Sequence, residues 1–422
     1  MIHHKMQTSK ARDEHFFRTV QKYLNIFVFF LPIGIVKIAG ISITFFIFLI
    51  IVYLFLKKRK KLFRIQYLTD YMLIVFFTIL IISIIFAEET FRPLGISADL
   101  KTIVRLIYWM TLALFIKTWS DRFDFYQISK YMFFGVLATI AFYYTLNISM
   151  EIMTQNSFAY VLVLGIPFSM YYLFKKYSFI VVFPFSALFF YFALASTSRA
   201  GAIIVFIQLI ILLFTAKYIR KKTLLFLSFI LLPLFFALYA NFDTYKMDLA
   251  DTLQPYSPDL SNLIAGGDQR LSIDKSWLDR KQMIVKGLTI FDEHPFLGIG
   301  FSHFKYYWVN MDIISPYLNK SMAFYNRLSA HNTYIQVLAG AGIFALSILL
   351  LLELIVVKKG FKILIQFRFT PQTFIFVSFL GMIIYFYVIA AGMGAVTWFV
   401  FGYGLSLLHT KKRTYKTEMG KK

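Results

Sequence analysis

Apolar stretches follow one another along most of the chain and are separated by short polar links. A helix needs about 20 apolar residues to cross a membrane, and about twelve stretches approach that length. The first two could form a tight hairpin. The pattern predicts an all-α polytopic membrane protein with about twelve transmembrane helices. The stretches lie at residues 24–38, 41–56, 68–87, 103–116, 131–146, 158–174, 179–195, 200–216, 224–240, 334–357, 374–391 and 395–408.

One long polar segment, residues 241–332, follows the ninth stretch. It divides the chain into an N-terminal transmembrane bundle (1–240), a water-facing loop, and a C-terminal part (333–422) with about three more spans and a basic tail. Binding and catalytic residues often lie on loops that a rigid scaffold, here the transmembrane helices, holds in place. We therefore expect the functional site to lie in this loop or directly beneath it.

Within the loop, residues 271–291 are expected to form an amphipathic helix. Such a helix can lie along the membrane surface with its apolar face down. Arg280 lies three residues after Trp277 and would share a face with it, at the level of lipid phosphates. The apolar residues that recur at spacings near three and four are Trp277, Leu278, Val285, Leu288 and Phe291.

Lysine and arginine outnumber aspartate and glutamate by 44 to 21, which gives a net charge of +23. Basic clusters follow the second, sixth, eighth and tenth stretches and close the chain, so all fall on one side if the helices alternate. By the positive-inside rule this side is the cytoplasm, which predicts cytoplasmic termini and an external loop. Short clusters beside apolar runs are topology signals, so they argue against a nucleic-acid partner.

The composition agrees with a membrane protein, because 59% of the residues are hydrophobic and 20% are aromatic. Cysteine is absent, which excludes disulfides, thiolate metal ligands and cysteine nucleophiles. The loop histidines lack i, i+4 spacing and an acidic cluster, which argues against a metal site. Gly298-Ile-Gly300 reads as a turn and not as a dinucleotide loop, and we expect no cofactor.

Charged residues inside apolar stretches are costly and are functional candidates by default. Arg105 lies just inside the fourth stretch, and Arg199 opens the eighth directly after Ser198. The alternative for both arginines is snorkelling to the lipid headgroups. Glu353 lies towards the cytoplasmic end of the tenth stretch, close to Lys358, and is interpreted as a local ion pair or a wetted helix end.

Three loop histidines compete for a proton-transfer role, because an unperturbed histidine titrates near pH ~6.5. His294 precedes a proline in a turn and favours a structural role, and His303 has no obvious partner in the sequence. His331 lies at the membrane boundary just before the tenth stretch. Asn332 beside it is available as a helix cap or as a donor to substrate. Position therefore favours His331 as the general base.

Several motifs in the region 190–345 together resemble the O-antigen ligase superfamily, which also holds O-antigen polymerases and protein O-oligosaccharyltransferases. Each motif is weak alone, whereas their order and their placement relative to the membrane are fairly specific. They are Ser198-Arg199-Ala-Gly201 opening a span, Arg280 on a loop helix, His294-Pro-x-x-Gly-x-Gly300, and His331-Asn332-Thr-Tyr followed by Gly340-x-Gly342.

The resemblance implies a GT-C-like, inverting and metal-independent glycosyltransferase of the bacterial inner membrane, with its active site facing the periplasm. Its donor would be a glycan on undecaprenyl pyrophosphate, and its acceptor the lipid A core of lipopolysaccharide or another glycan. By resemblance His331 is the catalytic base, with Asn332 and Trp277 in support. Arg280 and Arg199 would bind the pyrophosphate, and Arg105 is a looser match.

The alternatives differ mainly in the acceptor. A polymerase would use a second lipid-linked repeat, and the single loop and the chain length lean mildly towards a ligase. A protein-glycosylating transferase is disfavoured because the sequence shows no extra C-terminal soluble region for a polypeptide. A transporter of lipid-linked glycans usually shows internal repeats, and no repeat relates the two halves of this chain.

Overall fold

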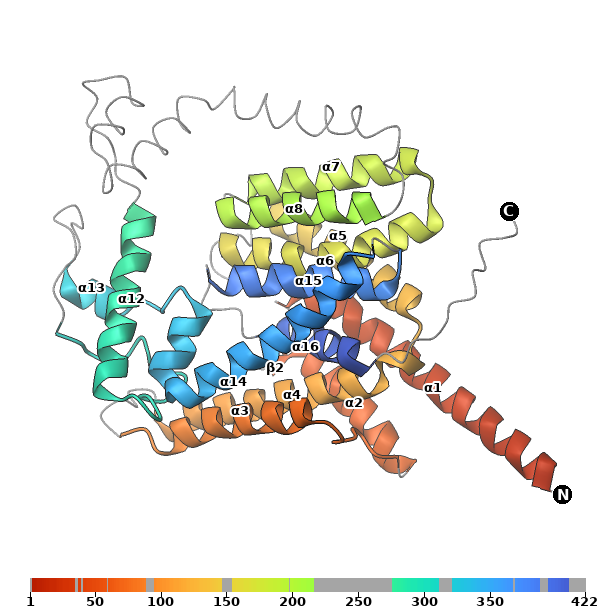
Figure 1. Ribbon diagram of the computed structural model, residues 1–422, viewed down its shortest axis with the longest axis horizontal. Coiled ribbons are helices and arrows are strands. Elements are labelled where there is room, and N and C mark those ends of the chain that lie inside the picture. Colours follow the sequence, from red (N-terminus) through yellow and green to blue (C-terminus); the bar gives the residue numbers. More distant parts are fainter. Residues whose placement is uncertain are drawn as a thin grey trace.

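Helices packed side by side form most of the protein, and the described loop residues 275–310 and 321–332 form a cap at one end (Figure 1). The computed structural model describes residues 2–34, 37–38, 41–58, 60–88, 95–145, 154–196, 198–215, 275–310, 321–366, 369–387 and 394–409. The bundle helices run in a common direction, whereas α12 (Lys275–Glu293) runs across their ends with α13 (Met322–Asn326) beside it. The N-terminal end of α1 lies at the opposite end of the molecule.

The regular secondary structure in the described residues is helical apart from one two-residue pairing between the first two bundle helices. There Lys37 lies opposite Ser42 in an antiparallel pair, which closes the predicted hairpin. The elements are α1 (Ile2–Ile33), β1 (Lys37–Ile38), β2 (Ile41–Ser42), α2 (Ile43–Lys57), α3 (Leu68–Ile85), α4 (Ile96–Trp119), η2 (Ser120–Arg122), α5 (Phe125–Thr145), α6 (Gln155–Lys176), α7 (Phe179–Ala195), α8 (Arg199–Thr215), α12, α13, α14 (Thr333–Leu364), α15 (Pro371–Phe386), α16 (Ala395–Ser406) and η3 (Leu407–His409).

Each predicted span that the structure describes contains a helix, although residues 37–38 and 41–42 of the first two spans form the short strands. The span at 179–195 coincides with α7, and the ninth span, 224–240, lies outside the described residues. By length and composition, four described helices could cross a membrane: Leu68–Ile85, Phe125–Tyr144, Asn156–Lys176 and Thr333–Leu364. Several shorter apolar helices accompany them. The chain is therefore an all-α membrane protein, as the apolar pattern predicts.

Helix α6 lies at the centre of the bundle and packs against α5, α7, α8 and α15. A second group, α3 and α4, lies across α14 and α16 from it (Figure 1). Aromatic side chains fill the space between the groups. The Trp398 ring on α16, for example, lies 4.6 Å from the ring of Phe77 and 5.1 Å from that of Phe401. Large aromatic side chains supply much buried apolar area at fixed geometry, so they define how these helices meet.

Helix α14 folds back on itself at Gly342, whose φ of 78° is non-helical. The Tyr334 hydroxyl lies 3.1 Å from Glu353 Oε2, although 19 residues separate them in sequence. In a straight helix those positions would be about 28 Å apart. The arm 333–341 therefore lies back along the arm 342–364, and its first turn reaches the level of Glu353.

The turn that contains Gly298 and Gly300 packs backbone to backbone against this bend. The amide N of Ile299 donates to Ala339 O at 3.1 Å, and Ile343 N donates to Pro295 O at 2.9 Å. A Cβ on Gly342 would collide with the carbonyl of Phe296, so a side chain has no space there. The predicted glycine turn is present, and it anchors the loop to the bend in α14.

Candidate functional site

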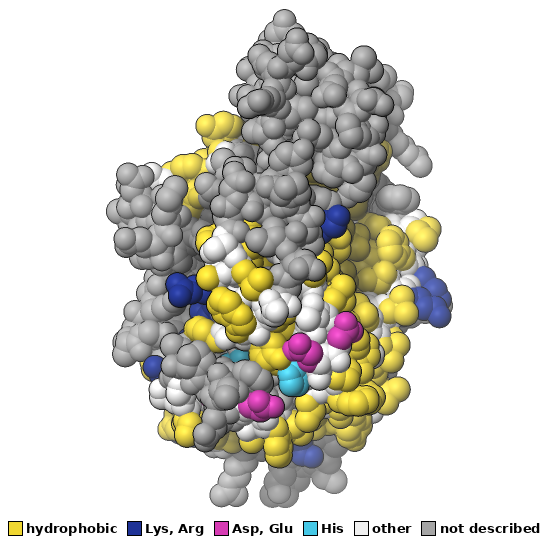
Figure 2. Space-filling model, turned by 90° about the vertical axis from the view of Figure 1, so that its left-hand side faces the viewer, with side chains coloured by type: hydrophobic (Ala, Val, Ile, Leu, Met, Phe, Trp, Pro, Cys, Tyr) yellow, Lys and Arg dark blue, Asp and Glu magenta, His cyan; other side chains and the backbone are white. Residues whose placement is uncertain are grey.

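The structure places Arg280 and His331 close together at the capped end of the bundle. Arg280 lies on α12, and His331 immediately precedes α14. Both side chains are half-buried, and the guanidinium of Arg280 acts electrostatically on the imidazole. Figure 2 shows this end of the molecule, where acidic side chains gather beside a histidine. A cation and a titratable base thus share one partly desolvated region.

His331 adopts a left-handed backbone conformation with φ of 49°, which no other non-glycine residue in the described part of the chain shows. A side chain in this region costs about 1–2 kcal/mol, and such strain tends to gather at functional sites. Asn332 follows as the N-cap of α14, and its Oδ1 accepts a hydrogen bond from Ile335 N at 3.1 Å. Of the two roles expected for Asn332, the structure shows the cap.

The pKa of His331 is lowered, first by burial and then by the nearby guanidinium of Arg280, while Asp279 opposes the shift. Both causes disfavour the imidazolium. The ring therefore remains neutral at physiological pH, the form that can accept a proton. No residue that the structure describes forms a hydrogen bond with this ring. Among the described residues, burial and the two nearby charges set its charge state.

Asp279 lies next to Arg280 on α12 and is held by a hydrogen bond from α13. Tyr325 on α13 donates its hydroxyl hydrogen to Asp279 Oδ1 at 2.9 Å. The carboxylate contributes a negative charge near His331. Neither Asp279 nor Tyr325 is a candidate by sequence, because a polar pair 46 residues apart carries no local signal.

The start of α8, where Arg199 lies, is linked to the same region through Tyr385 on α15. The Tyr385 hydroxyl donates to Asn156 O at 2.9 Å and lies 3.0 Å from Ser198 Oγ, the residue before Arg199. Because a phenol has one hydrogen, the Ser198 hydroxyl is the donor to Tyr385. Arg280 also acts electrostatically on the Tyr385 hydroxyl. Arg280 therefore acts on a tyrosine that contacts the residue before Arg199. The Arg199 side chain itself lies outside the described atoms.

Two predicted site residues are not brought to His331 by any contact among the described residues. Arg105 is exposed on α4, between Val104 and Ile107, whose side chains are also exposed. This is the setting expected for a residue that snorkels to the headgroups. Trp277 lies in the first turn of α12, and its side chain lies outside the described atoms.

The other two loop histidines have structural partners. His303, for which the sequence suggested no partner, is 3% exposed. Its Nε2 lies 2.9 Å from Asp99 Oδ1 on α4, and its Nδ1 lies 3.1 Å from Ile299 O. His294 Nε2 lies 3.1 Å from the hydroxyl of Tyr307. His303 joins the cap to the bundle and His294 joins two parts of the cap.

The predicted helix in the loop is present as α12, and the face that packs against the protein differs from the apolar face expected to rest on the membrane. Met283, Lys286 and Ile290 are fully buried, whereas Leu288 is 45% exposed. Lys286 can be buried because its Nζ donates to two carbonyls, those of Phe304 and Asn326, at 2.9 Å each. Hydropathy alone cannot anticipate a buried lysine that finds its acceptors in distant segments.

The interpretation of Glu353 as a local ion pair with Lys358 or as a wetted helix end is wrong. Glu353 is 4% exposed, and its hydrogen-bond partner is Tyr334. The fold-back of α14 explains the difference, because it carries the first turn of the helix to a position deep in the bundle. Lys358 lies beyond this contact along the same arm.

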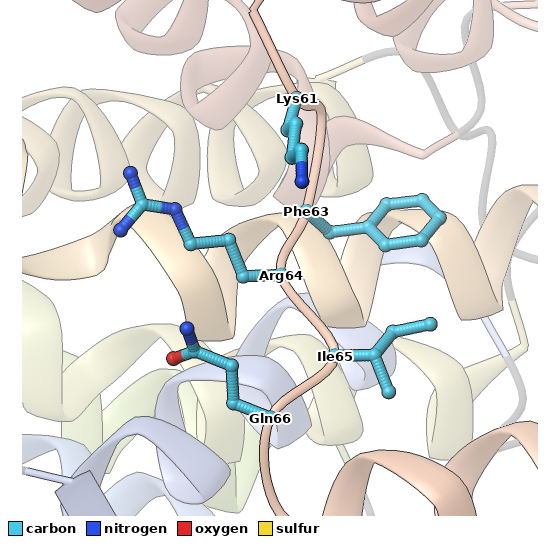
Figure 3. Close-up of a pocket in the computed structure, with 5 residues that line it drawn as sticks. All are labelled: Lys61, Phe63, Arg64, Ile65 and Gln66. Atoms are coloured by element: carbon cyan, nitrogen blue, oxygen red, sulfur yellow. The ribbon is translucent and has the colours of Figure 1, made fainter.

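A separate hollow of about 420 Å³ lies in the link between α2 and α3 (Figure 3). Arg64 and Gln66 point to one side of this extended segment, and Phe63 and Ile65 to the other. The opposite end of α3 contacts the cap, where Phe301 N donates to Ser83 Oγ at 3.3 Å. The hollow therefore lies at the far end of α3 from His331 and is not part of the site.

The fold and the site define an integral membrane protein that holds a cation beside a neutral histidine at one end of its helices. Residues 184–350 match the family described as O-antigen ligase. This match includes Arg199, Arg280 and His331 and confirms the resemblance to the O-antigen ligase superfamily. The family indicates a membrane glycosyltransferase of the ligase or polymerase type, with lipid-linked glycans as substrates. No curated protein matches the chain.

Proposed function

We propose that the chain is an O-antigen ligase-like glycosyltransferase. It moves a glycan from undecaprenyl pyrophosphate to a hydroxyl of the lipid A core, with inversion at the transferred carbon and without a metal. It does so in the bacterial inner membrane, with both termini cytoplasmic and with the cap, part of the loop 241–332, in the periplasm. The observation that carries the proposal is the approach of Arg280 to a half-buried His331 of lowered pKa.

The leaving group is an undecaprenyl pyrophosphate anion, which gains charge as the bond between the sugar carbon and the phosphate oxygen breaks. Guanidinium groups suit this task, because they stay charged and bind phosphate oxygens bidentately. Arg280 is close to Tyr385 and hence to the start of α8. Arg280 and Arg199 together hold the pyrophosphate, and Arg105 has at most an auxiliary role at the lipid boundary.

The acceptor is a hydroxyl group, which is too weak a nucleophile without help. Neutral His331 takes the hydroxyl proton as the acceptor oxygen attacks the sugar carbon from the face opposite the pyrophosphate. One C–O bond forms and one breaks, and the proton ends on the imidazole. General-base assistance of this kind is worth about 10²–10⁴-fold, and electrostatic stabilisation of the leaving group often more.

A polymerase is the second candidate, because the matched family supports ligase-type and polymerase-type activity alike. The same site would then transfer the growing glycan to the terminal sugar of another lipid-linked repeat. The two activities share the donor, the leaving group and the base, so they differ only in the acceptor that reaches His331.

The test uses the full chain in proteoliposomes, with undecaprenyl-pyrophosphate glycan as donor, lipid A core as acceptor and EDTA present. Wild type is compared with His331→Asn and with Arg280→Ala. Transfer to the lipid A core by wild type, lost in both variants, supports the proposal. Elongation of the glycan on its own carrier selects the polymerase. Movement of the donor across the membrane without transfer would overturn both and point to a transporter.

A further inference from the structure

Glu353 is a carboxyl group buried among the apolar side chains of the bundle. It is 4% exposed, and its neighbours along α14, Leu349, Leu352 and Val356, are fully buried. In the described part of the chain no lysine, arginine or histidine forms an ion pair with it. An unpaired carboxylate at this depth would be costly, so the group needs a specific reason to be there.

The hydrogen bonds around Tyr334 indicate which form of Glu353 is present. The Tyr334 hydroxyl lies 3.1 Å from Glu353 Oε2 and 3.2 Å from Ile383 O on α15. A phenol has one hydrogen, and a carbonyl oxygen only accepts. The single phenol hydrogen serves both contacts when Tyr334 donates to Ile383 O and a protonated Glu353 donates to Tyr334 through Oε2.

Tyr334 is well placed to control the position of His331. It lies three residues further along the chain, in the first turn of α14. Its ring also packs edge-on against Phe386, with centroids 6.1 Å apart. Tyr334 thus connects the arm that follows His331 to α15 and, through Glu353, to the second arm of α14. Only Thr333 and the N-cap Asn332 separate this restrained residue from the strained backbone at His331.

We infer that Glu353, as a neutral acid, positions the catalytic base by holding Tyr334 and the folded-back arm of α14. Glu353 is a positioning residue and does not touch the substrate. This inference rests on the proposed function insofar as His331 is the base. Positioning of a reacting group is sensitive to small shifts, because a displacement of about 1 Å can cost about 10²-fold in rate.

The test compares Glu353→Gln, Glu353→Ala and Tyr334→Phe with wild type in the transfer assay. An amide can replace a neutral acid, because its N–H donates to Tyr334 as the acid does. Glu353→Gln should retain kcat within about threefold, whereas Glu353→Ala and Tyr334→Phe should each lower kcat at least about tenfold with donor KM nearly unchanged. The double variant Glu353→Ala/Tyr334→Phe should have a kcat little lower than that of either single variant, because each single substitution already removes the same contact. Asp121→Asn, at an exposed acid on η2, is the control.

Two measurements are independent of transfer. Diethyl pyrocarbonate should modify His331 at an altered rate in Glu353→Ala and at the wild-type rate in Glu353→Gln, as followed by mass spectrometry. The infrared carbonyl stretch of a protonated carboxylic acid should disappear in Glu353→Gln and persist in Asp121→Asn.

An inactive wild type would overturn the proposed function, while these two measurements would still decide the positioning. If Glu353→Gln lowers kcat as much as Glu353→Ala does, the inference that Glu353 is a neutral acid fails. If neither variant changes kcat or the labelling of His331, the positioning role fails.

Discussion

The bundle and the cap are held together in different ways. The bundle has one continuous core of aliphatic and aromatic side chains that runs from Phe16 to Leu407. The cap has a small separate core around Met283, Tyr325 and Ala339. So small a core buries little apolar area, and the hydrophobic contribution scales with buried area. The cap therefore depends more on individual polar contacts.

Those polar contacts are specific to single atoms. Lys286 donates to two backbone carbonyls, and Asn326 accepts from Val309 N at 2.9 Å and donates to Val309 O at 3.0 Å. An apolar side chain in the bundle can often be replaced by another of similar volume. A buried polar partner in the cap cannot, because its loss leaves the other group without a hydrogen bond. The comparison predicts robustness in the bundle and sensitivity in the cap.

Substitution of His331 should have the largest effect on activity, because it removes the base while leaving both regions folded. His331→Asn is the informative variant, since asparagine tolerates the left-handed conformation that this position requires. We expect kcat to fall by about 10²–10⁴-fold with donor KM little changed, as measured in the transfer assay. His331→Ala adds backbone strain to the chemical loss, so it should also reduce stability. Near-normal kcat in His331→Asn would exclude a base at this position.

Gly342 is where the two regions meet, and a side chain there should disrupt both. In Gly342→Ala the new Cβ collides with the backbone of the cap turn at Phe296, and alanine pays about 1–2 kcal/mol for the positive φ. We expect a loss of folded protein, measured by size-exclusion chromatography and thermal unfolding in detergent. Gly394→Ala is the matched control, because nothing lies within 4 Å of its Cβ. Equal yields of the two variants would contradict the described contact.

The same contrast explains what could be predicted from sequence. Apolar runs predicted α3, α7 and the other bundle helices, because each run must be helical to satisfy its backbone in lipid. Hydropathy also predicted that a helix lies in the loop, but it did not reveal which face of α12 packs against the protein. The burial of Lys286 depends on acceptors that only the folded chain brings near.

The site was predictable only in part, for a related reason. His331 and Arg280 emerged from their place in the chain and from the resemblance to a known family. The contact between Tyr334 and Glu353 requires the bend at Gly342. The sequence does not reveal this bend, because Gly340 and Gly342 in an apolar run are equally compatible with an unbroken helix. An acidic residue within a long apolar stretch was the one signal available, and its partner could not be inferred without the fold-back.

Substitutions of the two charged residues that act on His331 should move its titration in opposite directions. Its neutral form is the base, so activity should fall as the pH drops through its lowered pKa. Arg280→Gln removes one cause of the lowering, so the acid limb of kcat against pH should move to higher pH. Asp279→Asn removes the opposing charge, so the limb should move to lower pH while Tyr325 keeps an acceptor. Shifts of the same sign in both variants would show that the limb does not report His331.

Arg105 provides the matched arginine for Arg280. Arg280→Ala should raise donor KM and lower kcat strongly, since it removes a charge beside the base. Arg105→Ala, on the exposed face of α4, should change either value by no more than about threefold, the range of a screened surface charge. An equal loss in the two variants would bring Arg105 into the pyrophosphate site and would make this part of the bundle as sensitive as the cap.

Cap stability should also depend on pH in a way that the stability of the bundle does not. Burial lowers the pKa of Lys286 from 10.5 to about 7. Between these values the unfolded chain binds a proton that the folded cap has released, so stability rises with pH, by at most about 1.4 kcal/mol per pH unit. A neutral lysine amine keeps two N–H groups, so Lys286 can still donate one hydrogen bond to each of the carbonyls of Phe304 and Asn326.

Limited proteolysis of the cap in detergent should therefore slow from pH 7 to pH 9 in wild type, after correction for the intrinsic activity of the protease at each pH. Lys286→Met keeps the length of the side chain and removes its titration, so its cleavage should not share this slowing. Lys281→Met, at an exposed position on the same helix, should behave like wild type. If Lys286→Met retains the full pH dependence, the buried lysine is not its source, and the cap is held by its apolar contacts much as the bundle is.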